Sequence, residues 1–342
     1  MKRKPLYAAL PHVSLFIEWL AGELDSSTLF RHQYLDRRSG QYWQCDSLFG
    51  AYQAYAWNHP GNARLGFNPG VSAASNARAL EALRQDLLAA GSDDKRMLLA
   101  AVDVMAWGGV TARNAAWLAD NRAGLGRMVQ VVKDALSAND PDASVLRSPS
   151  LRFNSGMTKV YSLICPDFII YDSRVAAALG MLVVKYCQAK DIEEVPEALR
   201  FPWAAAKEDK LARLPKRRDP STGTLRFKRL RSGSHHALWN MRASWVLSQV
   251  LAHPLAAGSP FQSLAAPENP LRALEAALFM IGYDLGPEQA AGEDENLEYS
   301  AEFAAQVLAL KAGPMIETTF EELEKLLRNR IKELSREERR DT

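Results

Sequence analysis

Cysteine is scarce in this 342-residue chain, which has only Cys45, Cys165 and Cys187. The three lie far apart without a paired spacing, so the sequence supports neither a disulfide framework nor a cysteine-rich zinc or iron-sulfur site. The histidines favour a metal no better, because His235 and His236 are adjacent and cannot form a helical i, i+4 pair. We therefore expect three buried thiols, no metal and no cofactor.

Long apolar runs are also missing, since the longest, such as 176–184, falls far short of the roughly 20 residues that a membrane-spanning helix needs. The basic start Met1–Pro5 is followed by Pro11 and Glu18 and lacks a small-residue cleavage site, unlike a secretory signal. Neither a Gly-rich phosphate loop nor a Gly-x-Ser-x-Gly nucleophile elbow occurs. These absences predict a cytoplasmic protein without a membrane partner.

Net charge of one sign is nearly absent, because 42 Lys and Arg face 40 Asp and Glu for a formal charge of +2. The charges are nevertheless segregated along the chain. Residues 207–231 hold ten Lys or Arg against three acids, whereas residues 286–324 hold ten acids and one lysine. Such a basic block is either a surface for a polyanion such as nucleic acid or a solvated loop that balances the acidic tail.

Helical periodicity dominates what the chain does contain, and alternating segments are few. Hairpins are expected only at the turn Arg38–Gly40 and over Thr224–Leu230. The fold class is therefore predicted to be all-α, mostly helical, with one or two small hairpins. Helices are predicted over residues 6–20, 75–90, 93–106, 112–138, 157–164, 175–189, 237–252, 270–281, 301–310 and 319–338.

Linker-like composition divides the chain at residues 137–149, which are rich in Asp, Pro and Ser, and again at residues 254–270. We expect an N-terminal helical lobe at 1–140 and a central lobe at 141–285 that carries the basic insertion 207–231. An acidic helical C-terminal extension is expected at 286–342.

One segment carries most of the chemistry: residues 155–175, SGMTKVYSLICPDFIIYDSRV. On its first helix Lys159 flanks the apolar stripe, which predicts a half-buried lysine. Partial desolvation favours the neutral amine that a nucleophile requires. Pro166 ends this helix, and Asp172 occupies the N-cap position of the next one. Taken singly, Lys159 is equally consistent with a surface lysine and Asp172 with an ordinary helix cap.

Together, Gly156-Met-Thr-Lys159-Val, the apolar helix, the proline and Asp172-Ser-Arg-Val resemble the helix-hairpin-helix DNA glycosylase superfamily, most of all its 8-oxoguanine glycosylase branch. The resemblance implies that Lys159 attacks C1′ of a damaged nucleotide and forms a Schiff base, with Asp172 assisting. It also implies that the hairpin residues Ser155, Gly156 and Thr158 hold phosphate.

The segment departs from that family in two places. Met157 stands where a second glycine is usual, and the interval of 13 positions from Lys159 to Asp172 is short for a repair enzyme. The wording around Lys159 and Tyr171 is similar to that of glycosylase-fold proteins from bacterial antiviral defence operons of the type IV CBASS kind. That similarity implies a modified guanine or a deazaguanine as substrate, and defence-operon proteins as further partners.

Other residues are candidates for the contacts that such an enzyme would make. Trp239, Asn240 and Arg242 open a helix after the basic block and are predicted to line a base pocket, as is Trp107. The alternative places Trp239 in the core, Arg242 in an ion pair and Trp107 at a helix end. The predicted nucleic-acid contacts outside the hairpin are Arg174, Lys216, Arg217, Arg218 and Arg229, although Arg174 could equally pair with Asp172.

Two functions follow as hypotheses. The first is N-glycosidic cleavage of a modified purine in nucleic acid, DNA above all, through a lysine Schiff base and with strand nicking by β-elimination. The second is a catalytically inactive glycosylase-fold module that binds a guanine-like base or a partner protein in a defence complex. A helical scaffold with an incidental motif is a third, plainer interpretation.

Overall fold

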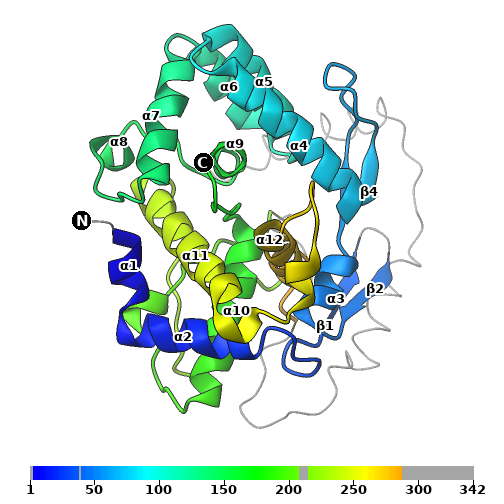
Figure 1. The fold of residues 1–342 in the computed structure, drawn as a ribbon, viewed down its shortest axis with the longest axis vertical. Helices are drawn as coiled ribbons and strands as arrows, with labels where there is room; N and C mark the ends of the chain where they lie inside the picture. Colours follow the sequence, from blue (N-terminus) through cyan, green and yellow to red (C-terminus); the bar gives the residue numbers. More distant parts are fainter. Residues whose placement is uncertain (1–2, 38–39, 208–214, 287–342) are drawn as a thin grey trace, which may run out of the picture. The chain divides into compact units, whose positions relative to one another are not determined.

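The computed structural model describes residues 3–37, 40–207 and 215–286 (Figure 1). All of them belong to one compact unit, Met1–Glu293. The prediction of a mostly helical fold is confirmed, because these residues form twelve α-helices and only two sheets, each of two strands. The predicted helices at 301–310 and 319–338, the rest of the acidic extension beyond residue 286, and part of the basic insertion, 208–214, lie outside the described residues.

The N-terminal third mixes short helices with both sheets. The helix predicted over 6–20 is two helices, because Pro11 takes the first helical position and starts a new one. Strands β1 and β2 form an antiparallel hairpin across the predicted turn at Arg38–Gly40. The elements are α1 (Arg3–Ala8), α2 (Pro11–Gly22), β1 (His32–Asp36), β2 (Gln41–Cys45), α3 (Leu48–Gln53), β3 (Ala56–His59) and β4 (Gly70–Ser72).

The prediction of a second hairpin over Thr224–Leu230 is wrong. The second sheet pairs β3 with β4 instead. In the part of the chain that the structure describes, the predicted stretch makes only isolated bridges, Thr222 with Leu225 and Trp203 with Arg229. Its alternation has another cause, because Leu225 and Phe227 are buried in the helical core while the basic residues between them are exposed.

The remaining helices agree closely with the sequence periodicity. The helix predicted over 112–138 is interrupted at Gly124, whose φ of 78° is left-handed and suits glycine. The elements are α4 (Ala73–Ala90), α5 (Asp94–Trp107), α6 (Thr111–Asp120), α7 (Leu125–Ser137), α8 (Ser144–Arg147), α9 (Met157–Ile164), α10 (Ser173–Ala189), α11 (Ser234–Ala252) and α12 (Pro270–Ile281), with 3-10 turns at Glu197–Leu199, Pro254–Ala256 and Pro260–Ser263.

Helix α9 lies among the other helices, where α4, α5 and α7 all pack against it, and every one of its residues is buried (Figure 1). Helix α12 packs against α3 and α10, so it joins the start of the chain to its later part. One buried apolar cluster runs from Tyr7 to Ile281 and draws on both predicted lobes. All three cysteines are buried and unpaired. None of the helices in the described ranges is long and apolar enough to cross a membrane.

Candidate active site

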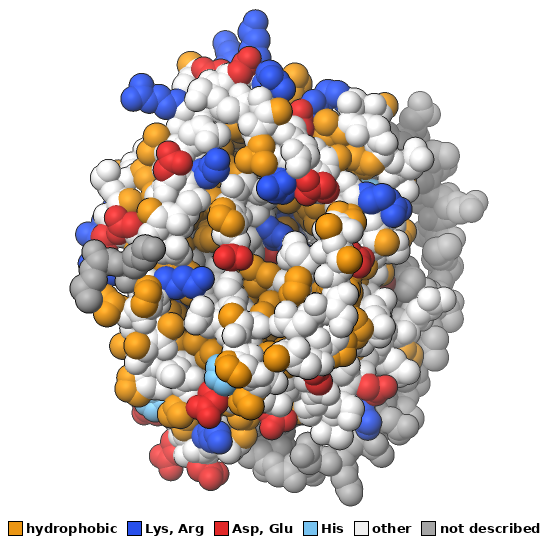
Figure 2. All heavy atoms as spheres, in the orientation of Figure 1, with side chains coloured by type: hydrophobic (Ala, Val, Ile, Leu, Met, Phe, Trp, Pro, Cys, Tyr) orange, Lys and Arg blue, Asp and Glu red, His pale blue; other side chains and the backbone are white. Residues whose placement is uncertain are grey.

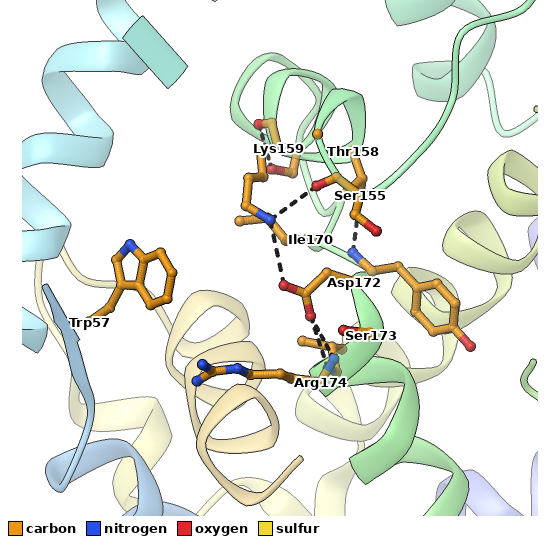
Figure 3. Close-up of polar contacts among 12 residues, drawn as sticks. Trp57, Ser155, Thr158, Lys159, Ile170, Asp172, Ser173 and Arg174 are labelled. Atoms are coloured by element: carbon orange, nitrogen blue, oxygen red, sulfur yellow. Dashed lines mark hydrogen bonds and ion pairs between the residues drawn. The ribbon is translucent and has the colours of Figure 1, made fainter. Parts of the chain in front are cut away.

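Lys159 and Asp172 meet at the junction of α9 and α10 (Figure 3). The Nζ of Lys159 lies 3.5 Å from Asp172 Oδ2 and donates a hydrogen bond of 3.0 Å to the backbone carbonyl of Ser155. Only 5% of Lys159 and 8% of Asp172 is exposed. The structure thus brings together the two residues that the sequence singled out. It buries Lys159 more deeply than the half-buried position that the sequence predicted.

Gly108 makes room for this lysine. A Cβ atom at position 108 would lie 2.6 Å from the Cδ of Lys159 and 2.8 Å from its Cε. The glycine follows α5 directly, where the backbone of the helix end forms a wall beside the lysine stem. Helical periodicity does not reveal this contact, because the two residues lie 51 positions apart in the sequence.

Asp172 is the N-cap of α10, as predicted, and its Oδ1 accepts hydrogen bonds from the amides of Arg174 and Val175. Burial alone would raise the pKa of this carboxyl. The positive charges of Lys159, Arg174 and Arg218, together with the Val175 amide, outweigh burial and hold the pKa below its ordinary value. Asp172 is therefore an ionised partner for the lysine at neutral pH.

The hairpin before α9 is built differently from the phosphate grip that the resemblance implies. The side-chain oxygen of Asn154 accepts hydrogen bonds of 2.9 and 3.0 Å from the amides of Gly156 and Met157. A Cβ at Gly156 would lie 2.3 Å from the Asn114 amide nitrogen, so a glycine is required there. These two amides already have a protein acceptor, which argues against their predicted role with phosphate.

The predicted phosphate contact of Thr158 is wrong in this structure, because its side chain is fully buried. Its hydroxyl donates 2.5 Å to Asn240 and accepts a hydrogen bond from the Tyr171 amide, 3.1 Å away. Asn240 in turn donates 2.9 Å to the carbonyl of Ile169. Thr158 and Asn240 thus hold the link between α9 and α10, and Asn240 is a core residue rather than part of a base pocket.

A second clamp fixes the same link. Glu275 on α12 accepts a hydrogen bond of 2.7 Å from the amide of Ile170 and forms an ion pair of 2.5 Å with Arg272. Arg272 also donates to the carbonyls of Ser162 and Phe168. The link therefore has acceptors and donors along its whole length, and this explains how an interval of only 13 residues holds Lys159 against Asp172.

A cavity of about 1560 Å³ opens in front of the lysine and the aspartate. The face of the molecule in Figure 2 is hollowed near its centre, and a positively charged side chain is visible in the hollow. Aromatic residues from distant elements line the cavity beside Lys159 and Asp172, among them Tyr55, Trp57, Trp107, Phe279 and Tyr283. The cavity is large enough to admit a nucleotide, and its wall offers flat surfaces for a planar ring.

Trp57 is the most conspicuous residue that the sequence analysis missed. In Figure 3 it lies across from Lys159 and Asp172, with Arg174 extending from α10 toward it. Its indole N–H donates 2.9 Å to the carbonyl of Trp107, and its ring contacts Phe279 edge-on at 5.4 Å. No helical period surrounds Trp57, because it lies on the short strand β3, and only the fold brings it into the same cavity as Lys159.

Of the four residues predicted to line a base pocket, three lie outside the cavity that contains Lys159. Trp239 packs edge-on against Phe201 in the core, and the guanidinium of Arg242 lies over Trp239 and Tyr7 rather than in an ion pair. Neither they nor Asn240 lines the cavity with Lys159, whereas Trp107 does. The period of α11 points these side chains at the helical core, a direction that the sequence alone left open.

The basic block splits into two groups. Arg218 is buried and donates to the carbonyl of Tyr283 and to the Ser173 hydroxyl, so it braces the start of α10 instead of facing solvent. Arg217 donates to the backbone carbonyls of Asp219 and Ser221. Lys216 lies over the Tyr283 ring and lines the cavity, while Arg229 is exposed with its guanidinium 3.7 Å above Trp203. Of the four predicted contacts in this block, Lys216 therefore lies on the cavity wall and Arg229 on the exposed surface outside it.

Within the described ranges, no group of three or more His, Cys, Asp or Glu side chains is arranged to hold a metal ion. No family model, curated protein or solved structure matches the chain. The resemblance to glycosylases therefore rests on the sequence of residues 155–175 alone and stays a prediction.

Proposed function

We propose that this protein is a lysine-dependent N-glycosylase that cleaves the bond between a modified purine and its sugar in nucleic acid. The observation that carries the proposal is the Lys159 amine, 3.5 Å from an ionised Asp172 and lining a cavity large enough to admit a nucleotide. An amine that is buried, paired with a carboxylate and open to a cavity has the arrangement of an activated nucleophile.

The proposed reaction begins when the Lys159 ammonium gives one proton to the ionised Asp172, and the neutral Nζ, which keeps two protons, attacks C1′ of the sugar. The bond from C1′ to the base nitrogen breaks with its electron pair, and Asp172 passes its proton to the departing base. Opening of the sugar ring moves a second Nζ proton to O4′ and leaves a protonated imine between Lys159 and C1′. Loss of a C2′ proton then expels the 3′ phosphate and nicks the strand.

The cavity wall supports a nucleobase as the bound group. Stacking of a base on an aromatic side chain contributes about 1–3 kcal/mol. Trp57 suits this task because its N–H is already bonded to Trp107 and its orientation is fixed before a ligand arrives. A base must leave the helix stack to reach an enclosed lysine, and the cationic residues Lys207 and Lys216 on the cavity wall would hold the surrounding phosphates.

The alternative is a binding module of the same fold that recognises a guanine-like base, or a partner protein in a defence complex, without cleaving a bond. The amides of Gly156 and Met157 favour this alternative. They already donate to the Asn154 side chain, so fewer donors are left to bind a phosphate than in a hairpin with open amides. Under this alternative Lys159 is a buried counter-ion of Asp172 and its replacement leaves binding intact.

Borohydride trapping separates the two. The wild type and Lys159→Gln are incubated with DNA and RNA oligonucleotides carrying guanine, 8-oxoguanine, a deazaguanine or an abasic site, reduced with borohydride, and analysed by intact mass. We expect an adduct with the wild type and none with Lys159→Gln, with little loss of stability, because glutamine still donates to the Ser155 carbonyl. Lys190→Gln, which removes an exposed lysine, is the matched control and keeps the adduct. An adduct that persists in Lys159→Gln contradicts the proposed role.

A further inference from the structure

The guanidinium of Arg174 is surrounded by aromatic rings. It lies 4.2 Å from the ring centroid of Phe279, 4.8 Å from that of Tyr283 and 5.7 Å from that of Trp57. Among the described residues, no side chain or carbonyl accepts a hydrogen bond from its guanidinium, and no carboxylate lies within ion-pair distance of it. Ring faces stabilise the cation, but in this part of the chain they leave its five N–H donors without acceptors.

Arg174 is held in place from its backbone outward. Its amide donates to Asp172, and the backbone of Gly282 packs so closely that a Cβ there would lie 1.8 Å from the Arg174 carbonyl. The side chain lines the cavity that contains Lys159 and extends toward Trp57 (Figure 3). A rigid fork of donors thus faces the space in which a stacked ring would lie.

We propose that Arg174 is the specificity-determining residue of this cavity and that it recognises the O6 and N7 edge of a guanine-type base lying against Trp57. This inference rests on the proposed function, in which the cavity holds a nucleobase. Two adjacent acceptors in one plane match the two donors of a guanidinium fork, and in purines O6 and N7 of guanine form such a pair. Adenine presents an amino donor in place of O6, which would oppose Arg174.

Two observations favour a base edge over a phosphate as the acceptor. The three rings that surround the guanidinium give it an apolar setting on most sides, which suits a flat heterocycle better than a hydrated phosphate. Arg174 also shares the cavity with Asp172, the carboxylate beside it, whose negative charge would repel a phosphate close by. A neutral carbonyl and ring nitrogen meet no such repulsion.

The test measures binding of guanosine, 7-deazaguanosine and adenosine by equilibrium dialysis to the wild type, Arg174→Ala and Arg174→Lys. We expect the wild type to prefer guanosine over adenosine by roughly tenfold or more, the size of one bidentate contact, with 7-deazaguanosine between them. The preference falls close to one in Arg174→Ala and is mostly lost in Arg174→Lys, because an ammonium keeps the charge without the fork. Arg147→Ala, which removes an exposed arginine outside the cavity, is the control and keeps the preference.

A second measurement compares how much Arg174→Ala lowers borohydride trapping on a base-containing oligonucleotide and on an abasic one. A base contact predicts a larger fold-loss on the base-containing oligonucleotide, whereas equal losses would assign Arg174 to phosphate and overturn the inference. Equal affinity of the wild type for the three nucleosides, or binding of none, also overturns it. Preference for guanosine that depends on Arg174 without any Lys159 adduct would keep the inference and reject the proposed catalysis.

Discussion

Two buried carboxylates, Asp172 and Glu275, come from different parts of the chain and line the same cavity as Lys159, and their surroundings move their pKa values in opposite directions. Burial outweighs Arg272 and the Ile170 amide at Glu275 and raises its pKa, whereas at Asp172 the positive charges outweigh burial and lower the pKa. Both are less than a tenth exposed. The difference lies in the neighbours, since Asp172 faces Lys159, Arg174 and Arg218 while Glu275 has Arg272.

The comparison assigns different tasks to similar groups. Asp172 lines the cavity, contacts the amine and is ionised at rest, as the proposed acceptor of the lysine proton must be. Glu275 also lines the cavity, but its oxygen is occupied by the Ile170 amide and Arg272, so it positions the link between α9 and α10. Burial alone does not distinguish a carboxylate that is available for proton transfer from one that holds the fold. The distinction depends on which atoms its oxygens already contact.

The largest expected effect separates the two carboxylates directly. Asp172→Asn keeps the helix cap, because asparagine also caps helices, but removes the charge beside the amine. We expect about a 10²-fold slower formation of the trapped adduct, the lower end of the range for a lost proton-transfer group. Glu275→Gln, the matched variant, keeps an acceptor for Ile170 and changes the rate far less. Equal losses in single-turnover trapping would erase the distinction.

A smaller effect tests the geometry from the side of the lysine. In Gly108→Ala the new methyl would overlap the Lys159 stem, which is flexible enough to move away and take Nζ from Asp172. We expect trapping to slow by roughly tenfold, since misplacement of a reacting group by a fraction of an ångström is costly. The thermal midpoint should hardly change. Gly258→Ala, where a Cβ meets no atom within 4 Å, is the control; a rate equal to it would contradict the contact.

The next effect concerns Thr158, whose buried hydroxyl joins the link between α9 and α10 to Asn240 on α11. Thr158→Val removes the hydroxyl that accepts from Tyr171 and donates to Asn240. We expect a loss of about 1 kcal/mol or somewhat more in the free energy of unfolding, because buried polar partners are left without a bond. Urea unfolding measures it, with the exposed Thr28→Val as the control. An unchanged stability would return Thr158 to the phosphate role that the sequence suggested.

The smallest effect is the pH dependence of stability, and its sign differs between the carboxylates. The lowered pKa of Asp172 stabilises the fold above its unfolded value of about 3.9, and this contribution is lost as pH falls through the folded pKa. The raised pKa of Glu275 works in reverse, so stability falls as pH rises from about 4.3 through its folded value. Urea midpoints from pH 3 to 7 should show opposite slope changes in Asp172→Asn and Glu275→Gln; equal changes would refute the contrast.

Much of the helical scaffold could be predicted from the sequence, because apolar spacing reports which face of a helix is buried. Helix α12 begins and ends where the pattern placed it, and Asp172 caps α10 as its residue type indicates. The Lys159 and Asp172 pair was predictable for the same reason, since both residues belong to one short segment whose turn is local.

The aromatic wall could not be predicted, because its members meet only after folding. Trp57 lies on a two-stranded sheet and Phe279 on α12, and no periodicity links residues that far apart. The roles predicted for Asn240 and Arg218 were wrong for a related reason. A polar residue type does not reveal whether the side chain bonds to water or to a buried carbonyl. Burial does alternate along Leu225 and Phe227, as the pattern indicated. The segment is nevertheless a loop whose apolar side packs on helices, not a strand of a hairpin.

The late position of α12 in the chain has a consequence for the order in which the protein is made. Lys159 and Asp172 leave the ribosome more than a hundred residues before Glu275 and Phe279, which complete the clamp and the wall around Arg174. During synthesis Lys159 and Trp57 therefore exist first without the residues of α12 that complete the cavity. Under the proposed function, a chain that stops before α12 would lack the Glu275 clamp and the Phe279 ring beside Arg174, so activity would begin only after α12 has folded onto the rest.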